Sequence, residues 1–327
     1  MDTLKWILTI LLVACLGSLN AQPERESRSM RVLMDNDFLN FRGAGTDRYY
    51  TNGIRIDYFF KKKRKAKFPS SILLNISKDN NNVYGWGLAQ FMFTPQDITL
   101  PDIHYNDRPY GGALYAIHSL QSIDTAKKIK VTTELFLGVI GPISFAEESQ
   151  TWVHGMINSP KPEGWHNQVS NDIILNYNIT IEKQILYPSK SILLLGFVET
   201  YSGTLYNAAG MGFMLRIGKF NNYFNGAPKI DVGVKNKYQL YVFMRPTARV
   251  VIGNALMEGG LISQLTQSQQ GYTLDKDLVE RLCVLYDVGL TFEMPGFSIS
   301  LIQKLRTPEF KGSHSQEVGN ITMQFKI

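Results

Sequence analysis

A histidine with a glutamine four positions before it is the pair in this sequence that best suits proton transfer. His154 and Gln150 lie in a stretch, residues 141–170, that lacks strand periodicity. If this stretch is helical, both side chains lie on one face. Imidazole titrates near neutral pH and can take a proton from water. A lone loop histidine is commonly a surface residue, but the spacing from Gln150 favours His154. We take His154 as the candidate base, with His166 as its rival and mid-strand His118 as structural.

A run of oxygen-bearing side chains, Asp35-Asn36-Asp37, could hold a metal ion. If the run is a strand, Asp35 and Asp37 point one way and Asn36 the other. Calcium prefers such hard oxygen ligands, although a full site needs six or more of them. The plainer interpretation is an Asx-rich strand end, which is common at turns.

Several familiar chemistries are missing from the chain. There is no G-x-S-x-G elbow of a serine hydrolase, no H-E-x-x-H zinc motif and no glycine-rich phosphate loop. Only one cysteine, Cys283, lies beyond the first 21 residues, so no internal disulfide is expected in the exported chain. No internal repeat or low-complexity linker divides the chain, which predicts one domain over residues 22–327.

Period-two alternation runs through this domain and predicts an all-β fold. Ile321, Met323 and Phe325, for example, alternate with polar residues. Most segments run ten to fourteen residues, which suits tilted strands that cross a bilayer better than soluble strands. We therefore expect a closed antiparallel transmembrane β-barrel of twelve strands, because only closure pairs every backbone amide in lipid. The expected strands are 30–39, 50–60, 83–93, 110–121, 129–140, 171–184, 190–200, 209–219, 238–253, 282–293, 296–306 and 318–327.

The first residues predict export. Lys5 and the apolar run 6–14 resemble a secretory signal peptide that spans residues 1–21 and is cleaved after Ala21. Lipoprotein cleavage before Cys15 is the alternative. With the N-terminus in the periplasm, the longer loops and the polar motifs fall at the outer end of the barrel, and several inner turns are short. The expected location is the bacterial outer membrane.

The net charge of +6 includes a basic cluster, in which six of the seven residues 61–67 are Lys or Arg. A solvated loop is the plain interpretation, and a contact with anionic head groups of outer-membrane lipids is the alternative. Nucleic acid is not expected as a partner of an exported chain, and nothing in the sequence indicates an obligate protein partner.

Six motifs together give the chain a family resemblance. From about Met34 to its C-terminus it resembles the lipid A 3′-O-deacylases of the LpxR type. The resemblance is most specific at DNDF (35–38), TDRYYTNGIRIDY (46–58), FTPQD (93–97), DRPYGG (107–112), GVIGPISFAEESQTWVH (138–154) and GWHNQ (164–168). It implies a twelve-stranded barrel with its active site at the outer, lipid-facing end. It also implies a carboxylic ester hydrolase that uses Ca²⁺ to remove an ester-linked acyl chain from the lipid A of lipopolysaccharide.

The resemblance also carries over site residues. Asn36 and Asp37 match the Asn-Asp pair of the family, and Thr51 matches its strand-two threonine. Gln150 and His154 match its glutamine and its catalytic histidine, so His154 would be the general base. Asp37 is then the expected metal ligand.

Two positions depart from the family pattern. Residues 94–100 lack the lysine that follows the Thr-Pro turn, and Pro160 stands where an acid is found six residues past the histidine, with Glu163 as a loose substitute. Two alternatives therefore stay open: an outer-membrane phospholipase that uses the same base, and a porin-like or structural barrel without catalysis.

Overall fold

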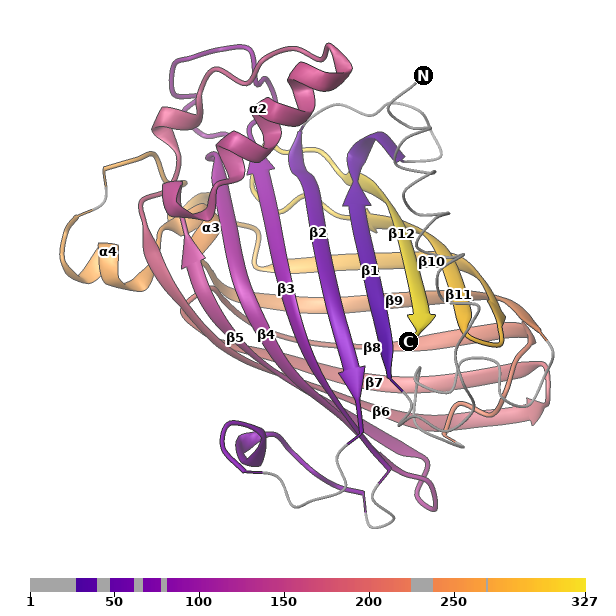
Figure 1. Ribbon diagram of the computed structural model, residues 1–327. Coiled ribbons are helices and arrows are strands. Elements are labelled where there is room, and N and C mark those ends of the chain that lie inside the picture. The colour runs from indigo at the N-terminus through magenta and orange to yellow at the C-terminus, as the bar shows by residue number, and fades with distance from the viewer. Residues whose placement is uncertain (1–27, 40–47, 62–66, 78–80, 225–237, 269) are drawn as a thin grey trace.

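Twelve antiparallel strands close into a barrel in which β1 pairs with both β2 and β12 (Figure 1). The computed structural model describes residues 28–39, 48–61, 67–77, 81–224, 238–268 and 270–327. The expected signal peptide, residues 1–21, lies outside these ranges. Within them, no helix has both the length and the apolar character needed to cross a membrane.

All twelve predicted strands are confirmed, with bounds that differ by a few residues. The strands are β1 (Ser29–Asn36), β2 (Tyr49–Phe60), β3 (Asn82–Thr94), β4 (Gly111–Asp124), β5 (Ile129–Ile140), β6 (Asp172–Ser189), β7 (Ile192–Gly203), β8 (Tyr206–Lys219), β9 (Gln239–Asn254), β10 (Leu282–Met294), β11 (Phe297–Arg306) and β12 (Gln316–Lys326). The helices are η2 (Asp37–Leu39), η3 (Ser70–Ile72), η4 (Pro142–Ser144), α2 (Ala146–Ile157), η5 (Trp165–Asn167), α3 (Ala255–Glu258), α4 (Leu261–Leu265) and η6 (Lys276–Leu278).

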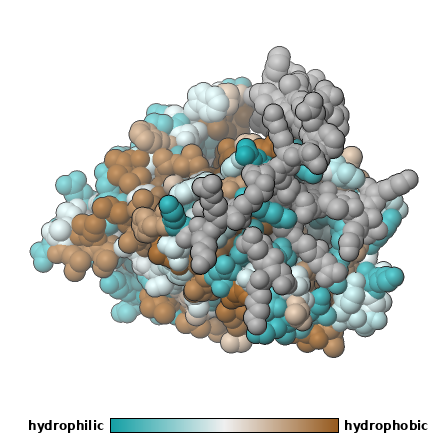
Figure 2. Space-filling view, turned by 60° about the horizontal axis from the view of Figure 1, so that its bottom comes forward, coloured by the Kyte–Doolittle hydropathy of each residue, from teal (hydrophilic) through white to brown (hydrophobic). Residues whose placement is uncertain are grey.

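Side chains alternate between the lumen and the outer wall, as period two requires. The outward residues are largely apolar and exposed, among them Leu137 (62% exposed), Met211 (65%) and Val288 (47%). Figure 2 shows such brown apolar side chains over the wall beside the grey segments. This apolar exterior is the surface that a transmembrane barrel presents to acyl chains.

Charged residues point into the lumen and pair there. Asp57, 1% exposed, lies 2.6 Å from Arg31 Nη2 and 2.9 Å from Arg55 Nε, and Arg55 also reaches Glu134 at 2.6 Å. Because a buried charge is costly without a partner, these pairs allow the interior of the barrel to be polar.

We predict that Asp57→Ala costs about 3–5 kcal/mol in the free energy of unfolding, because it leaves two largely buried arginines without this carboxylate. Urea unfolding of the protein in lipid vesicles, followed by tryptophan fluorescence, measures the loss. Glu163→Ala is the control. It removes an exposed pair with Lys161, at 3.7 Å, and such pairs contribute about 0–1 kcal/mol. Equal urea midpoints for the two variants would contradict the prediction.

At the end of the barrel opposite α2, residues 67–77 lie against the exterior, lipid-facing side of β4–β6. Leu74 N donates to Thr133 Oγ1 (3.3 Å), and Tyr177 OH donates to Ile72 O (2.6 Å). His118 Nδ1 donates to Gly85 O (2.9 Å), so its Nε2 accepts from Ser70 Oγ (2.7 Å). His118 therefore ties this segment to the wall, which agrees with the structural role predicted for it.

Candidate active site

Helix α2, in the connection between β5 and β6, carries the predicted pair on its buried face. Ala146, Gln150 and His154 are the buried residues of this helix, spaced four apart. The stretch around the pair is therefore helical, which is the condition under which the two side chains share a face. Glu147 and Glu148 lie in the first turn, where acidic side chains complement the helix dipole.

A glycine in β4 lets α2 approach the wall closely. A Cβ at Gly112 would lie 2.3 Å from Ala146 Cβ and 2.2 Å from Ser144 Oγ, closer than atoms can pack. Ala113, the next residue, lines the lumen, so Gly112 faces the opposite way. Helix α2 thus packs on the outer, lipid-facing side of β3 and β4, near their outer ends (Figure 1).

The imidazole of His154 is 5% exposed and is oriented by the chain that follows its helix. His154 Nδ1 lies 2.5 Å from the carbonyl oxygen of Pro160. A carbonyl oxygen can only accept a hydrogen bond, so Nδ1 carries the proton. Nε2 then has the lone pair that can accept a proton.

Gln150 is 2% exposed, and its Oε1 accepts a hydrogen bond of 2.7 Å from Trp165 Nε1. Its other amide atom, Nε2, is buried and has no hydrogen-bond partner among the residues that the structure describes. Gln150 therefore presents an unused donor one turn before His154 on the same face of α2.

Asn36, Asp37 and Thr51 lie at the outer ends of β1 and β2. Asn36 ends β1 and pairs in register with Asn52, and its Oδ1 accepts from Phe38 N at 2.8 Å. Asp37, 6% exposed, begins η2, so the strand that we expected to continue through it stops at Asn36. Its Oδ2 accepts from Arg48 N at 3.2 Å.

Thr51 sits at a β-bulge between Tyr50 and Asn52, and its hydroxyl hydrogen-bonds Thr94 on β3 at 2.8 Å. Asn36 on β1, Thr51 on β2 and Thr94 on β3 thus cross three adjacent strands, and α2 packs on β3 and β4. The structure therefore places all five predicted site residues at the outer end of the wall that β1–β4 form.

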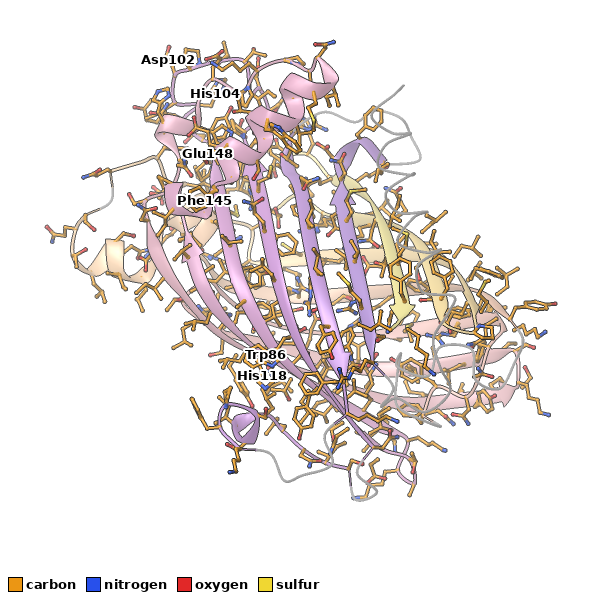
Figure 3. The ribbon with its side chains drawn as sticks, in the orientation of Figure 1. Trp86, Asp102, His104, His118, Phe145 and Glu148 are labelled. Carbon is orange, nitrogen blue, oxygen red and sulfur yellow. The ribbon has the colours of Figure 1, made fainter. Side chains whose placement is uncertain are left out.

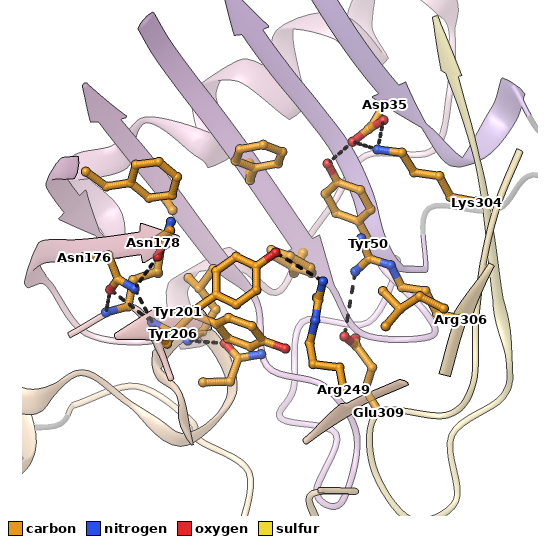
Figure 4. A pocket seen from close by; sticks show the side chains of 18 of the residues that line it. Asp35, Tyr50, Asn176, Asn178, Tyr201, Tyr206, Arg249, Lys304, Arg306 and Glu309 are labelled. Atoms are coloured by element: carbon orange, nitrogen blue, oxygen red, sulfur yellow. Dashed lines mark hydrogen bonds and ion pairs between the residues drawn. The ribbon is translucent and has the colours of Figure 1, made fainter. Parts of the chain in front are cut away.

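Asp35 belongs to a different environment, the lumen. Its carboxylate accepts hydrogen bonds from Tyr50 OH (2.6 Å), Lys304 Nζ (2.8 Å) and Asn320 Nδ2 (2.6 Å). With Arg108, Arg249, Arg306 and Glu309 it lines a cavity of about 410 Å³ (Figure 4). The cavity and the five predicted residues are separate features, because none of the five is among the described residues that line the cavity.

The loop carboxylate Glu309 neutralises part of the charge in this cavity. Burial alone would raise the pKa of the Glu309 carboxyl, but the Arg108 and Arg306 guanidiniums hold that pKa below its usual range. Arg108 Nη1 lies 2.5 Å from this carboxylate, and Arg306 Nη1 lies 3.8 Å from it.

Comparison with known proteins decides the family. The model of the family described as outer membrane protein LpxR matches residues 7–327. The chain belongs to the LpxR family. LpxR from Salmonella typhimurium has a similar structure, with a TM-score of 0.72 at 19% identity over 91% of this chain and 100% of that one. The beta domain of the Bordetella autotransporter BrkA is matched with a TM-score of 0.43 at 7% identity, over 92% of this chain and 99% of that one. A comparison with curated protein sequences finds no match.

Membership of the LpxR family and the barrel fold make this chain an outer membrane protein. The metal expected from the family resemblance can be tested against the donors on the wall. Asp37, Asn36 and Thr51 offer a carboxylate, an amide carbonyl and a hydroxyl, the oxygen donors that calcium takes together with backbone carbonyls and water. No group of three His, Cys, Asp or Glu side chains that could hold a metal occurs among the described residues. By chemical type these three oxygen donors would suit calcium, with Asp37 as the charged ligand, better than they would suit zinc, which prefers histidine and cysteine.

At the position of the missing acid, a backbone carbonyl contacts the histidine. Pro160, which stands where LpxR-type sequences have an acid, supplies the carbonyl that contacts His154. Glu163, considered as a substitute, lies 3.7 Å from Lys161. The sequence did not reveal this carbonyl, because every residue type carries one. It also gave no role to Trp165, although the motif GWHNQ (164–168) contains it.

Proposed function

We propose that this LpxR-family protein is a hydrolase that removes an ester-linked acyl chain from lipid A at the outer face of the membrane. The observation that carries the proposal is the orientation of His154. In a neutral imidazole whose Nδ1–H donates to a carbonyl, the lone pair that accepts a proton is on Nε2.

The placement of α2 supports a lipid substrate. This helix lies on the lipid side of the wall, and its outward residues Trp152 (67% exposed), Met156 (44%) and Ile157 (53%) are apolar. A substrate with acyl chains in the outer leaflet would approach Gln150 and His154 along the wall, without entering the lumen.

The expected step is the direct attack of water on the ester carbonyl. The oxygen of water forms a bond to the carbonyl carbon while His154 Nε2 takes its proton. The carbon–oxygen bond to the sugar then breaks, and His154 returns the proton to the departing alkoxide. The products are a free fatty acid and a hydroxyl group on the sugar.

Calcium, when bound, would supply positive charge that stabilises the oxyanion of the tetrahedral intermediate. Asp37 would hold the ion, with Asn36 and Thr51 as neighbouring oxygen donors. The role of the missing lysine in gripping the substrate has no replacement within residues 94–100.

Mass spectrometry of lipid A from cells with and without the protein tests the proposal. We expect lipid A that has lost one ester-linked acyl chain only when the protein is present. In parallel, the purified protein is incubated with lipid A and with phospholipid in detergent that contains calcium. Release of fatty acid from phospholipid alone would identify a phospholipase, and no release from either would favour a non-enzymatic barrel.

A further inference from the structure

Trp165 is fully buried at the start of η5 and anchors the loop that follows α2. Its ring packs against Tyr110, with centroids 4.9 Å apart, in a cluster that includes Met92 and Ala146. Gly164 allows this close packing, because a Cβ there would lie 2.6 Å from the Tyr110 ring. The indole therefore has a fixed position between the wall and α2.

The indole fixes the orientation of the Gln150 amide. Indole Nε1–H is a donor only, so the amide atom 2.7 Å from it must be the carbonyl oxygen. The two ends of a glutamine amide are otherwise hard to tell apart. Here the donor-only indole requires that Gln150 Nε2 point away from Trp165.

Gln150 Nε2 is left without a hydrogen-bond partner among the described residues, although it is buried. A buried N–H group without an acceptor is unfavourable. Such a group is satisfied when an acceptor arrives with the substrate. His154 lies on the same face of α2 one turn later. This acceptor would therefore be close to the ester that the water activated by His154 attacks.

We propose that Trp165 is a positioning residue, which holds Gln150 so that Nε2 donates to the oxyanion formed on the ester carbonyl oxygen. This inference rests on the proposed hydrolase function. It assigns Gln150 a donor role in the transition state and Trp165 an effect that acts only through Gln150.

The test compares Trp165→Phe, which keeps an aromatic ring but lacks the N–H donor, with the wild type on lipid A. We expect kcat to fall on the order of 10- to 100-fold, because the amide can then turn away from the oxyanion. KM should stay nearly unchanged, since the oxyanion exists only in the transition state. Gln150→Ala should lower kcat on the order of 10²- to 10³-fold, and adding Trp165→Phe to it should cause no further loss.

Gln150→Glu isolates the donor. It keeps an oxygen for the indole and replaces only Nε2, so it should be as inactive as Gln150→Ala. This variant also tests the idea if Trp165→Phe does not fold, which heat-dependent mobility on detergent gels reveals. Trp86→Phe is the matched control, because Trp86 stacks on His118 with centroids 4.1 Å apart, at the end of the barrel opposite α2 (Figure 3). Its turnover should match the wild type.

The outcomes separate the two proposals. A wild-type protein that releases no fatty acid from lipid A contradicts the proposed function itself. An active wild type whose Trp165→Phe or Gln150→Glu variant keeps full kcat overturns the positioning role. Additive losses in the double variant would also overturn it, because they would mean that Trp165 acts independently of Gln150.

Discussion

His154→Ala should lower the rate of lipid A hydrolysis on the order of 10²- to 10⁴-fold, the usual contribution of a general base. The variant should still fold, because the stability of the barrel comes from its closed strand ladder and not from a side chain on α2. The measurement is the initial rate of fatty acid release by purified protein in detergent with calcium present. The wild-type rate should also fall at acid pH, where a protonated imidazole cannot accept a proton.

His166→Ala is the matched control for this prediction. His166 lies in η5, within the same outer connection, and its Nε2 is 3.1 Å from Asn167 Nδ2 at the exposed surface. We expect near-wild-type turnover from this variant. If His166→Ala were inactive while His154→Ala kept its rate, the assignment of the base would be wrong.

Asp37→Ala should lower hydrolysis on the order of 10²-fold, which corresponds to the several kcal/mol of charge stabilisation that a metal ion supplies. Removal of calcium with a chelator should have a similar effect on the wild type, and calcium added back should restore the rate. A second measurement does not depend on turnover: calcium should raise the thermal midpoint of the wild type but not that of Asp37→Ala, because an ion stabilises only the fold that binds it.

Asp102→Ala provides the control for the loss of an acidic side chain at the same end of the barrel, since Asp102 is exposed near α2 (Figure 3). Its rate and its response to calcium should be those of the wild type. Full hydrolysis in excess chelator, or an unchanged calcium response in Asp37→Ala, would count against the calcium site.

The sequence by itself determined the barrel, because period two is a local property of each strand. Alternation along stretches such as residues 318–327 identifies a strand wherever it lies, and strands of bilayer length must close to satisfy their backbone. The four-residue spacing of Gln150 and His154 likewise anticipated one face of α2, since helical geometry alone sets it.

Only the tertiary structure decided what each of these side chains contacts. Alternation separates Asp35 from Asn36, but the register of β1 against its neighbours places Asp35 in the lumen beside Lys304, 269 positions away in sequence. The acceptor that orients His154 is the backbone carbonyl of Pro160, and every residue type carries a carbonyl, so no residue type could announce it. The indole of Trp165 meets Gln150 because loop 164–168 places it between α2 and the wall. Such a contact depends on the packing of the whole outer end, which a sequence motif does not specify.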